Sequence, residues 1–165
     1  MAPYEPVTQE ILAQLEAIAP GRVTAGEDVN PDYGRDEMPI YGVHMPEAAV
    51  EVLSTEEAAA VVKLCYDHNI PVTTRGAGTG LVGGCVPLYG GVVLVTTRMN
   101  RILDYDLENF TVTVQPGVLL NTLAEDASSK GLLSSPRSRR EVCYPGRQRL
   151  HQRRRHAGRQ VRLHP

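Results

Sequence analysis

The sequence predicts an α+β fold for most of its 165 residues, with a βαβ unit followed by mixed strands and one more helix. Three observations lead to this prediction. Short runs rich in Val, Ile and Leu alternate with segments in which apolar residues recur every three or four positions. A glycine-rich stretch directly follows one of these runs. The strand-like runs and the helical periodicity both end near Leu133, where the charge of the chain also changes sign. We therefore expect a structural boundary there.

Residues 1–46 are expected to form one helix and a lead-in loop. From Thr8 to Ala19 the apolar residues fall on one face of a helix, Thr8 can cap its first turn, and Pro20-Gly21 ends it. Residues 21–46 carry Pro, Gly and acidic side chains with almost no apolar run, which is typical of a long loop.

The main domain is predicted to span residues 47–133 and to begin with the βαβ unit. Residues 48–53 are the first strand, Ser54 and Glu57 match a capping box at the start of a helix, and residues 70–74 are the second strand. Because such a crossover joins parallel strands and is nearly always right-handed, we expect the two strands to run in the same direction.

Three more strands and a helix complete the predicted domain. Residues 91–95 form a short apolar run typical of a buried strand, and residues 101–106 and 110–115 are expected to pair with each other. Residues 118–130 have helical periodicity, and Gly131 can end that helix.

The glycine-rich stretch is the candidate binding site. Five glycines lie within nine positions, so the backbone can adopt positive φ and come close to a ligand. Successive N–H groups in such a loop suit phosphate oxygens, and we expect Arg75 at its mouth to add positive charge and Thr79 a hydroxyl donor. The predicted ligand is an anion that carries phosphate. The expected contact residues in this loop are Arg75, Gly76, Ala77, Gly78, Thr79, Gly80, Leu81, Gly83, Gly84 and Cys85.

Two common phosphate-binding loops do not fit. A Rossmann fingerprint counted from Gly76 would end on Leu81 instead of a glycine, and Pro87 and a strand follow where a helix should begin. A P-loop needs Gly-Lys-Ser/Thr, and no Lys occurs between Lys63 and Lys130. The loop amides must therefore hold a phosphate without a helix dipole behind them. A glycine-rich turn that binds nothing is the alternative.

Several motifs in order along the chain resemble those of one known family. They are the string from Arg75 to Pro87, Gly90-Gly-Val-Val, Arg98-Met-Asn-Arg-Ile102 and Val112-Thr-Val-Gln-Pro-Gly-Val118. Together they resemble the FAD-linked oxidases with a p-cresol-methylhydroxylase-type FAD-binding domain, and most of all the branch of glycolate oxidase and D-lactate dehydrogenase. The resemblance runs from about Ile11 to Leu133, so the fold it implies is the N-terminal portion of that domain.

The resemblance implies FAD as the cofactor. It implies that Arg75 to Cys85 wraps the FAD pyrophosphate, while Pro116, Gly117 and Val118 lie against another part of the cofactor. It also implies oxidation of a 2-hydroxy acid to the 2-oxo acid, reoxidation by a separate electron acceptor and, in that branch, an iron-sulfur partner subunit. Some relatives bind the flavin covalently through a His in this loop, but the loop here has no His. Cys85 is a potential attachment point, although a small residue packed beside the loop is the simpler interpretation.

Residues 134–165 form a basic tail. Up to Leu133 the chain has 18 Asp and Glu against 7 Lys and Arg (7 − 18 = −11), whereas the tail has ten Arg, no Lys and only Glu141 (10 − 1 = +9). Its few hydrophobic residues form no face, so we expect disorder. Such an arm can bind nucleic acid, but with Tyr144 as its one aromatic and no RGG repeat, nucleic acid is not the expected partner.

Two further interpretations concern the same tail. The spacing of His151, His156 and His164 fits no common metal site, so none is expected. An Arg-rich segment with Gln, His, Pro and Gly is also what GC-rich DNA encodes in a shifted frame, and it begins where the resemblance stops. We prefer this hypothesis. In the family a second cofactor loop and a substrate domain with the catalytic base would follow, so no catalytic residue is expected here.

The whole chain is expected to be a cytoplasmic protein without a membrane span, because it has no run of 18 apolar residues and no signal-peptide pattern. Its three cysteines indicate neither disulfides nor a metal site. The leading hypothesis is the N-terminal part of an FAD-dependent oxidoreductase of 2-hydroxy acids, inactive alone because the substrate domain is missing. The alternative is a non-catalytic flavin- or anion-binding module whose basic tail binds nucleic acid.

Overall fold

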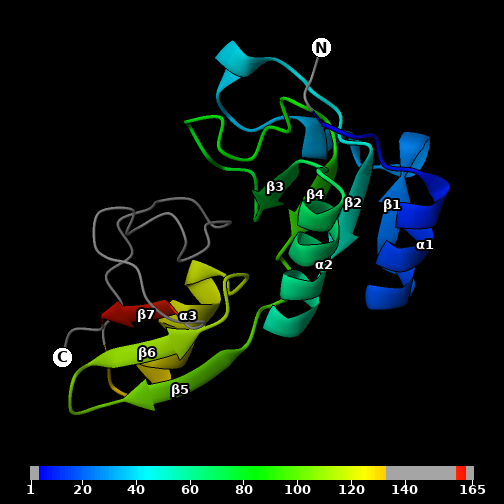
Figure 1. Ribbon diagram of the computed structural model, residues 1–165. Helices are drawn as coiled ribbons and strands as arrows, with labels where there is room; N and C mark the ends of the chain where they lie inside the picture. Colours follow the sequence, from blue (N-terminus) through cyan, green and yellow to red (C-terminus); the bar gives the residue numbers. More distant parts are fainter. Residues whose placement is uncertain (1–3, 133–158, 163–165) are drawn as a thin grey trace. The chain divides into compact units, whose positions relative to one another are not determined.

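The computed structural model describes residues 4–132 and 159–162. It shows the expected α+β fold, with helices and strands of mixed direction, and divides into two compact units, Met1–Arg98 and Met99–Pro165 (Figure 1). Each unit is described by itself. The interpretations of residues 134–165 as a nucleic-acid arm, a metal site or a frame-shifted product fall on residues that, apart from 159–162, lie outside the described ones.

The first unit is built on a four-stranded sheet. Its strands are β1 (Val23–Ala25), β2 (Ala48–Glu51), β3 (Val72–Arg75) and β4 (Val92–Val95), in the order β1-β2-β4-β3. Both β2 and β3 run parallel to β4, and β1 is antiparallel to β2. The prediction that β2 and β3 share one direction is therefore confirmed, although β4 lies between them.

Strand β1 lies inside the segment 21–46, which we expected to be a loop throughout. This expectation was wrong for three residues, because β1 is too short to show an alternating pattern and is held by backbone pairing with the edge of β2. The same segment also forms three short 3-10 helices, at Gly26–Asp28, Pro31–Gly34 and Pro39–Tyr41.

Two predicted helices are confirmed together with their caps. Helix α1 (Gln9–Ile18) begins after Thr8, whose Oγ1 accepts a hydrogen bond from the Ile11 N–H at 3.3 Å. Helix α2 (Thr55–Asp67) begins after Ser54, whose Oγ accepts from the Glu57 N–H at 3.2 Å. Figure 1 shows α1 beside β1, and α2 along β2 and β4.

The sheet of the first unit is covered on both faces. Ala49, Val93 and Val95 form one buried cluster with Val29, and the half-buried ring of Tyr33 packs against it. Because side chains alternate along a strand, Ala48 and Val50 point to the opposite face, where the helices pack. The irregular segment that contains the 3-10 helices therefore forms one layer of the fold.

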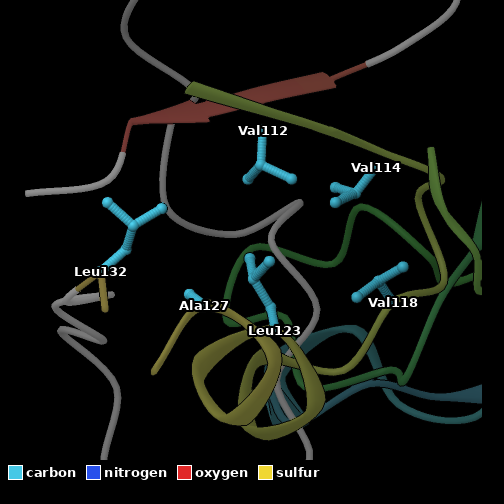
Figure 2. Close-up of a cluster of buried hydrophobic side chains, with 6 residues drawn as sticks. All are labelled: Val112, Val114, Val118, Leu123, Ala127 and Leu132. Atoms are coloured by element: carbon cyan, nitrogen blue, oxygen red, sulfur yellow. The ribbon is translucent and has the colours of Figure 1, made fainter. Parts of the chain in front are cut away.

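The second unit is a strand pair covered by a helix. Strands β5 (Ile102–Asp106) and β6 (Thr111–Val114) pair antiparallel, as predicted, and helix α3 (Leu120–Ser129) begins two residues later than the predicted helix. Figure 2 shows that the valines of β6 point toward α3. The resulting core consists of Val112, Val114, Val118, Leu123, Ala127 and Leu132.

A further strand, β7 (Arg159–Arg162), pairs antiparallel with β6. We expected disorder throughout the basic tail, and this expectation does not hold for these four residues. The outer edge of β6 presents unpaired backbone groups, which can bind any extended segment without a particular side-chain pattern. Sequence periodicity does not reveal pairing of this kind.

Candidate cofactor site

The glycine-rich segment connects β3 directly to β4, and the described residues between them contain no helix. Gly78 and Gly83 have φ of +71° and +69°, a region that other residues rarely adopt. The expectation of a loop without a helix dipole behind it is therefore confirmed, so any anion it holds must be bound by the loop itself.

Arg75, the last residue of β3, lies beneath this loop. Its side chain is only 7% exposed, and its Nη1 donates hydrogen bonds to the Arg35 carbonyl oxygen at 2.6 Å and to the Cys85 Sγ at 3.6 Å. The guanidinium carbon lies 5.4 Å from the centroid of the Tyr33 ring. A buried cation needs such partners, and they place Arg75 under the loop instead of at its mouth, where we expected it.

A second segment, residues 30–38, lies against the loop. The Glu37 N–H donates to the Gly80 carbonyl oxygen at 3.1 Å. Asp36 Oδ1 accepts from the Met38 N–H at 2.8 Å, while Asp36 Oδ2 is buried without a hydrogen-bond partner among the described residues. A Cβ on Gly80 would lie 3.2 Å from that oxygen. The loop therefore packs against residues 30–38, called the strap below, which are distant from it in sequence.

The strap and the first part of the loop line an open hollow of about 540 Å³. Of the predicted contact residues, the first five of the loop line it, whereas Leu81 is half exposed and Gly83 packs under the Tyr41 ring. The strap residues and Thr97 were missed, because no motif or periodicity marks them in the sequence. The complete lining is Asn30, Asp32, Tyr33, Arg35, Asp36, Glu37, Arg75, Gly76, Ala77, Gly78, Thr79 and Thr97.

Unused backbone donors distinguish this loop chemically. Within the described residues, none of the N–H groups of residues 76–84 donates a hydrogen bond to another protein group. The lining also contains three carboxylates, from Asp32, Asp36 and Glu37, against the two guanidiniums of Arg35 and Arg75. Net charge therefore does not attract an anion, and the N–H groups must supply the favourable interactions.

Cys85 lies at the far end of the loop and is half buried. Burial raises the pKa of its thiol, and the neighbouring Arg75 opposes this effect. These observations suit a small packed residue, which is the simpler of our two interpretations, and not an activated nucleophile.

Pro116, Gly117 and Val118 belong to the second unit. The Gly117 N–H donates to the Met99 carbonyl oxygen at 2.7 Å, and the Val118 side chain lies in the hydrophobic core, whereas Pro116 is exposed. Their predicted contact with the cofactor remains a prediction, because the geometry of the hollow concerns the first unit alone.

Residues 4–132 and 159–162 contain neither a metal-binding cluster nor a membrane-spanning helix. No group of three or more His, Cys, Asp or Glu residues there could hold a metal ion. None of the helices in this described part is long and apolar enough to cross a bilayer.

Comparison with known proteins identifies the family. A family model described as an FAD binding domain matches residues 46–144, which include β2, α2, β3, the glycine loop and the second unit up to α3. The chain belongs to the FAD-binding domain family. FAD is accordingly the cofactor of this domain, as the sequence resemblance implied.

Curated relatives of this FAD-binding domain include two enzymes of hydroxy acids. D-lactate dehydrogenase of Anaerostipes hadrus is 56% identical over 133 residues, covering 81% of this chain and 28% of the relative. Glycolate oxidase subunit GlcD of Bacillus subtilis (strain 168) is 38% identical over 116 residues, covering 70% of this chain and 23% of the relative. The chain therefore spans about a quarter of the length of these relatives.

Solved structures agree with the fold of the FAD-binding domain. Substrate-bound p-cresol methylhydroxylase superposes with a TM-score of 0.67 at 28% identity, over 78% of this chain and 27% of that one. An alkyldihydroxyacetonephosphate synthase superposes with a TM-score of 0.71 at 23% identity, over 87% and 32%. At 23% identity, the similarity to the synthase concerns the fold alone.

The hollow suits the chemistry of FAD. The pyrophosphate of FAD offers only acceptor oxygens, which match the unused N–H groups of residues 76–84. Hydroxyl groups of FAD donate hydrogen bonds, which match carboxylates such as Asp36, whose Oδ2 has no partner among the described residues. Gly78 lets the backbone come close to a ligand, because its φ excludes most other residues.

Proposed function

We propose that this chain is the N-terminal part of an FAD-dependent oxidoreductase that converts 2-hydroxy acids to 2-oxo acids. The observation that carries the proposal is the glycine loop. Among the described residues none of the N–H groups of residues 76–84 donates a hydrogen bond to protein, and residues 76–79 line a hollow of about 540 Å³. The names of the two relatives supply the substrate class, because D-lactate and glycolate are both 2-hydroxy acids.

In the proposed enzyme the glycine loop of the first unit holds the phosphates of the cofactor. Residues 75–85 contact the FAD pyrophosphate through backbone N–H groups, and Pro116, Gly117 and Val118 contact another part of FAD. When bound, FAD would supply two-electron oxidation: it would take a hydride equivalent from the C–H bond of the alcohol carbon, and the hydroxyl proton would pass to a base as C=O forms. None of the described residues is assigned to proton removal from substrate, so we propose that the chain binds FAD but does not turn over substrate alone.

The electron acceptor of the proposed enzyme is a separate protein. One relative is named as a subunit of glycolate oxidase, which supports an assembly of several chains. We propose an iron-sulfur subunit as the partner, because such a centre can take electrons one at a time from a reduced flavin.

Titration of the purified chain with FAD tests the proposal. We expect saturable, one-to-one quenching of flavin fluorescence and no reduction of an artificial electron acceptor when D-lactate or glycolate is added. Absence of FAD binding by a folded chain would refute the cofactor assignment, and turnover would refute the proposed inactivity. Salt-sensitive binding of a DNA duplex without flavin binding would favour a basic nucleic-acid module instead.

A further inference from the structure

Arg75 carries a positive charge beside the glycine loop, and direct contact with a phosphate is its obvious role. The contacts of its guanidinium indicate another. We infer that Arg75 is a positioning residue, which holds the loop from beneath in the shape that binds FAD. The inference rests on the proposed function, because FAD is the ligand that the loop is proposed to hold.

Nη1 and one face of the guanidinium are already in contact with protein. Nη1 donates to the Arg35 carbonyl oxygen and to the Cys85 Sγ. Nη2 lies so close to Gly78 that a Cβ on that glycine would collide with it. The Tyr33 ring lies 5.4 Å from the guanidinium carbon. Arg75 is only 7% exposed, so most of its surface is in contact with protein, although it also lines the hollow.

The same contacts connect the whole loop. The backbone of Arg75 is the beginning of the loop, Gly78 lies in its middle and Cys85 at its far end. The beginning is fixed in turn by Thr96, whose N–H and Oγ1 donate to the Arg75 carbonyl oxygen at 2.9 and 3.3 Å. A single planar group therefore fixes the distance between the middle and the end of the loop, and ties both to the strap through Arg35.

This role requires the shape of arginine as well as its charge. Guanidinium is flat and offers donors in a fixed fork, so it can lie under Gly78 while Nη1 bridges two acceptors. The ammonium of lysine is a compact point charge that cannot make these contacts at once. A phosphate ligand, in contrast, accepts a hydrogen bond from either cation.

The test compares Arg75→Lys, Arg75→Gln and the control Lys63→Gln, which removes an exposed charge on α2. FAD affinity is measured by flavin fluorescence at low and high salt. We expect both Arg75 variants to bind FAD about tenfold more weakly, equivalent to about 1.4 kcal/mol. We expect the ratio of low-salt to high-salt affinity to match that of the unmodified chain and of the control.

Direct phosphate contact predicts a different pattern. Arg75→Lys would then bind FAD nearly as well as the unmodified chain, and Arg75→Gln would lose part of the salt dependence, because one charge pair would be gone. That pattern would overturn the inference. If the contacts of Arg75 had no influence on the site, FAD affinity would be unchanged in all folded variants. This result would also overturn the inference.

A second measurement does not depend on FAD. The Glu37 N–H is bonded to the Gly80 carbonyl oxygen, so the exchange rate of this amide hydrogen reports how firmly the loop rests on the strap. We expect Arg75→Gln to accelerate Glu37 exchange about tenfold. An unchanged exchange rate of the Glu37 amide in Arg75→Gln would overturn the inference, whether or not the unmodified chain binds FAD. Failure of the unmodified chain to bind FAD would instead refute the proposed function.

If Arg75→Gln does not fold, Tyr33→Leu provides the alternative variant. It removes the aromatic ring next to the guanidinium and leaves every charge in the hollow in place. A positioning role predicts faster Glu37 exchange and weaker FAD binding for this variant, with unchanged salt dependence. If folded Tyr33→Leu bound FAD as tightly as the unmodified chain, the positioning role of Arg75 would be contradicted.

Discussion

The backbone N–H of Glu37 donates to the carbonyl oxygen of Gly80 at 3.1 Å and so joins an acidic strap to the glycine loop. This hydrogen bond occupies one of the acceptor groups of the loop. Among the residues that the structure describes, the N–H groups of residues 76–84 have no hydrogen-bond acceptor in the protein. The strap therefore helps to make the loop a surface of donors.

Gly78→Ala is expected to destabilise the first unit. A Cβ at this position would collide with the Arg75 guanidinium, and the φ of +71° costs an alanine about 1–2 kcal/mol. We expect the free energy of unfolding in urea to fall by about 2 kcal/mol or more. Gly84→Ala is the matched control for stability, because its Cβ would meet nothing closer than Val82 Cγ2 at 3.8 Å. Equal stability of the two variants would contradict the described loop.

Acid should destabilise the first unit through Glu57. Its carboxylate accepts hydrogen bonds from Arg22 at 2.6 and 2.8 Å and from the Leu53 N–H at 2.8 Å. The Arg22 bond is the main reason that the pKa of Glu57 lies below its ordinary value of 4.5. The stabilisation is thus present above pH 4.5 and is lost as the pH falls through the lower pKa of the folded state.

Glu57→Gln tests this acid dependence. We expect it to lower the free energy of unfolding at pH 7 by about 1–3 kcal/mol and to flatten the loss of stability below pH 4.5, measured by urea denaturation. Asp67→Asn removes an exposed pair with Lys63 and should change stability by less than about 1 kcal/mol. If stability fell as steeply below pH 4.5 in Glu57→Gln as in the unmodified chain, Glu57 would not have the assigned role.

Alkali should destabilise the second unit through Tyr105. Its hydroxyl donates to Asp126 Oδ2 at 2.5 Å, and burial followed by this bond raises the pKa of Tyr105 above its ordinary value of 10.0. Stability from the protonated hydroxyl is complete below pH 10 and declines above it. Tyr105→Phe should lower the free energy of unfolding by about 1–2 kcal/mol at pH 7 and weaken the decline above pH 10. Tyr66→Phe, at an 83% exposed position, should do neither.

The cysteines should differ in their reactivity. Cys65 is fully buried, which raises its pKa to about 11. Cys85 is half buried, and burial raises its pKa while the charge of Arg75 opposes the rise. In a Cys143→Ser background, a thiol reagent at pH 8 should modify Cys85 first, but more slowly than a free thiol, since little thiolate is present. FAD should slow this reaction further. Faster modification of Cys85 than of a free thiol would indicate an activated group instead of a packed one.

Local signals in the sequence predicted the helices well. Thr8 and Ser54 cap α1 and α2 as expected, because a side-chain oxygen beside a first turn has only local partners to find. Strand pairing between β5 and β6 was likewise predictable from alternation over a short connection. The insertion of β4 between β2 and β3 was not predictable, because strand order depends on contacts distant in sequence.

The site was predicted only where a motif marks it. Glycine spacing identified the loop, since positive φ is a property of single residues. The strap from Asn30 to Met38 was missed, because it meets the loop through backbone groups that leave no pattern in the side chains. Arg75 was found, but its location under the loop depends on Tyr33 and Arg35, which precede it by about forty residues.

The central claim is that the N–H groups of residues 76–84 hold FAD, and amide hydrogen exchange tests it most directly. Without FAD these amides should exchange rapidly, because none of them donates a hydrogen bond within the described residues. With saturating FAD, several of them should become protected about tenfold or more, while the exposed turn around Glu108 should not. FAD binding that leaves residues 76–84 unprotected would contradict the claim.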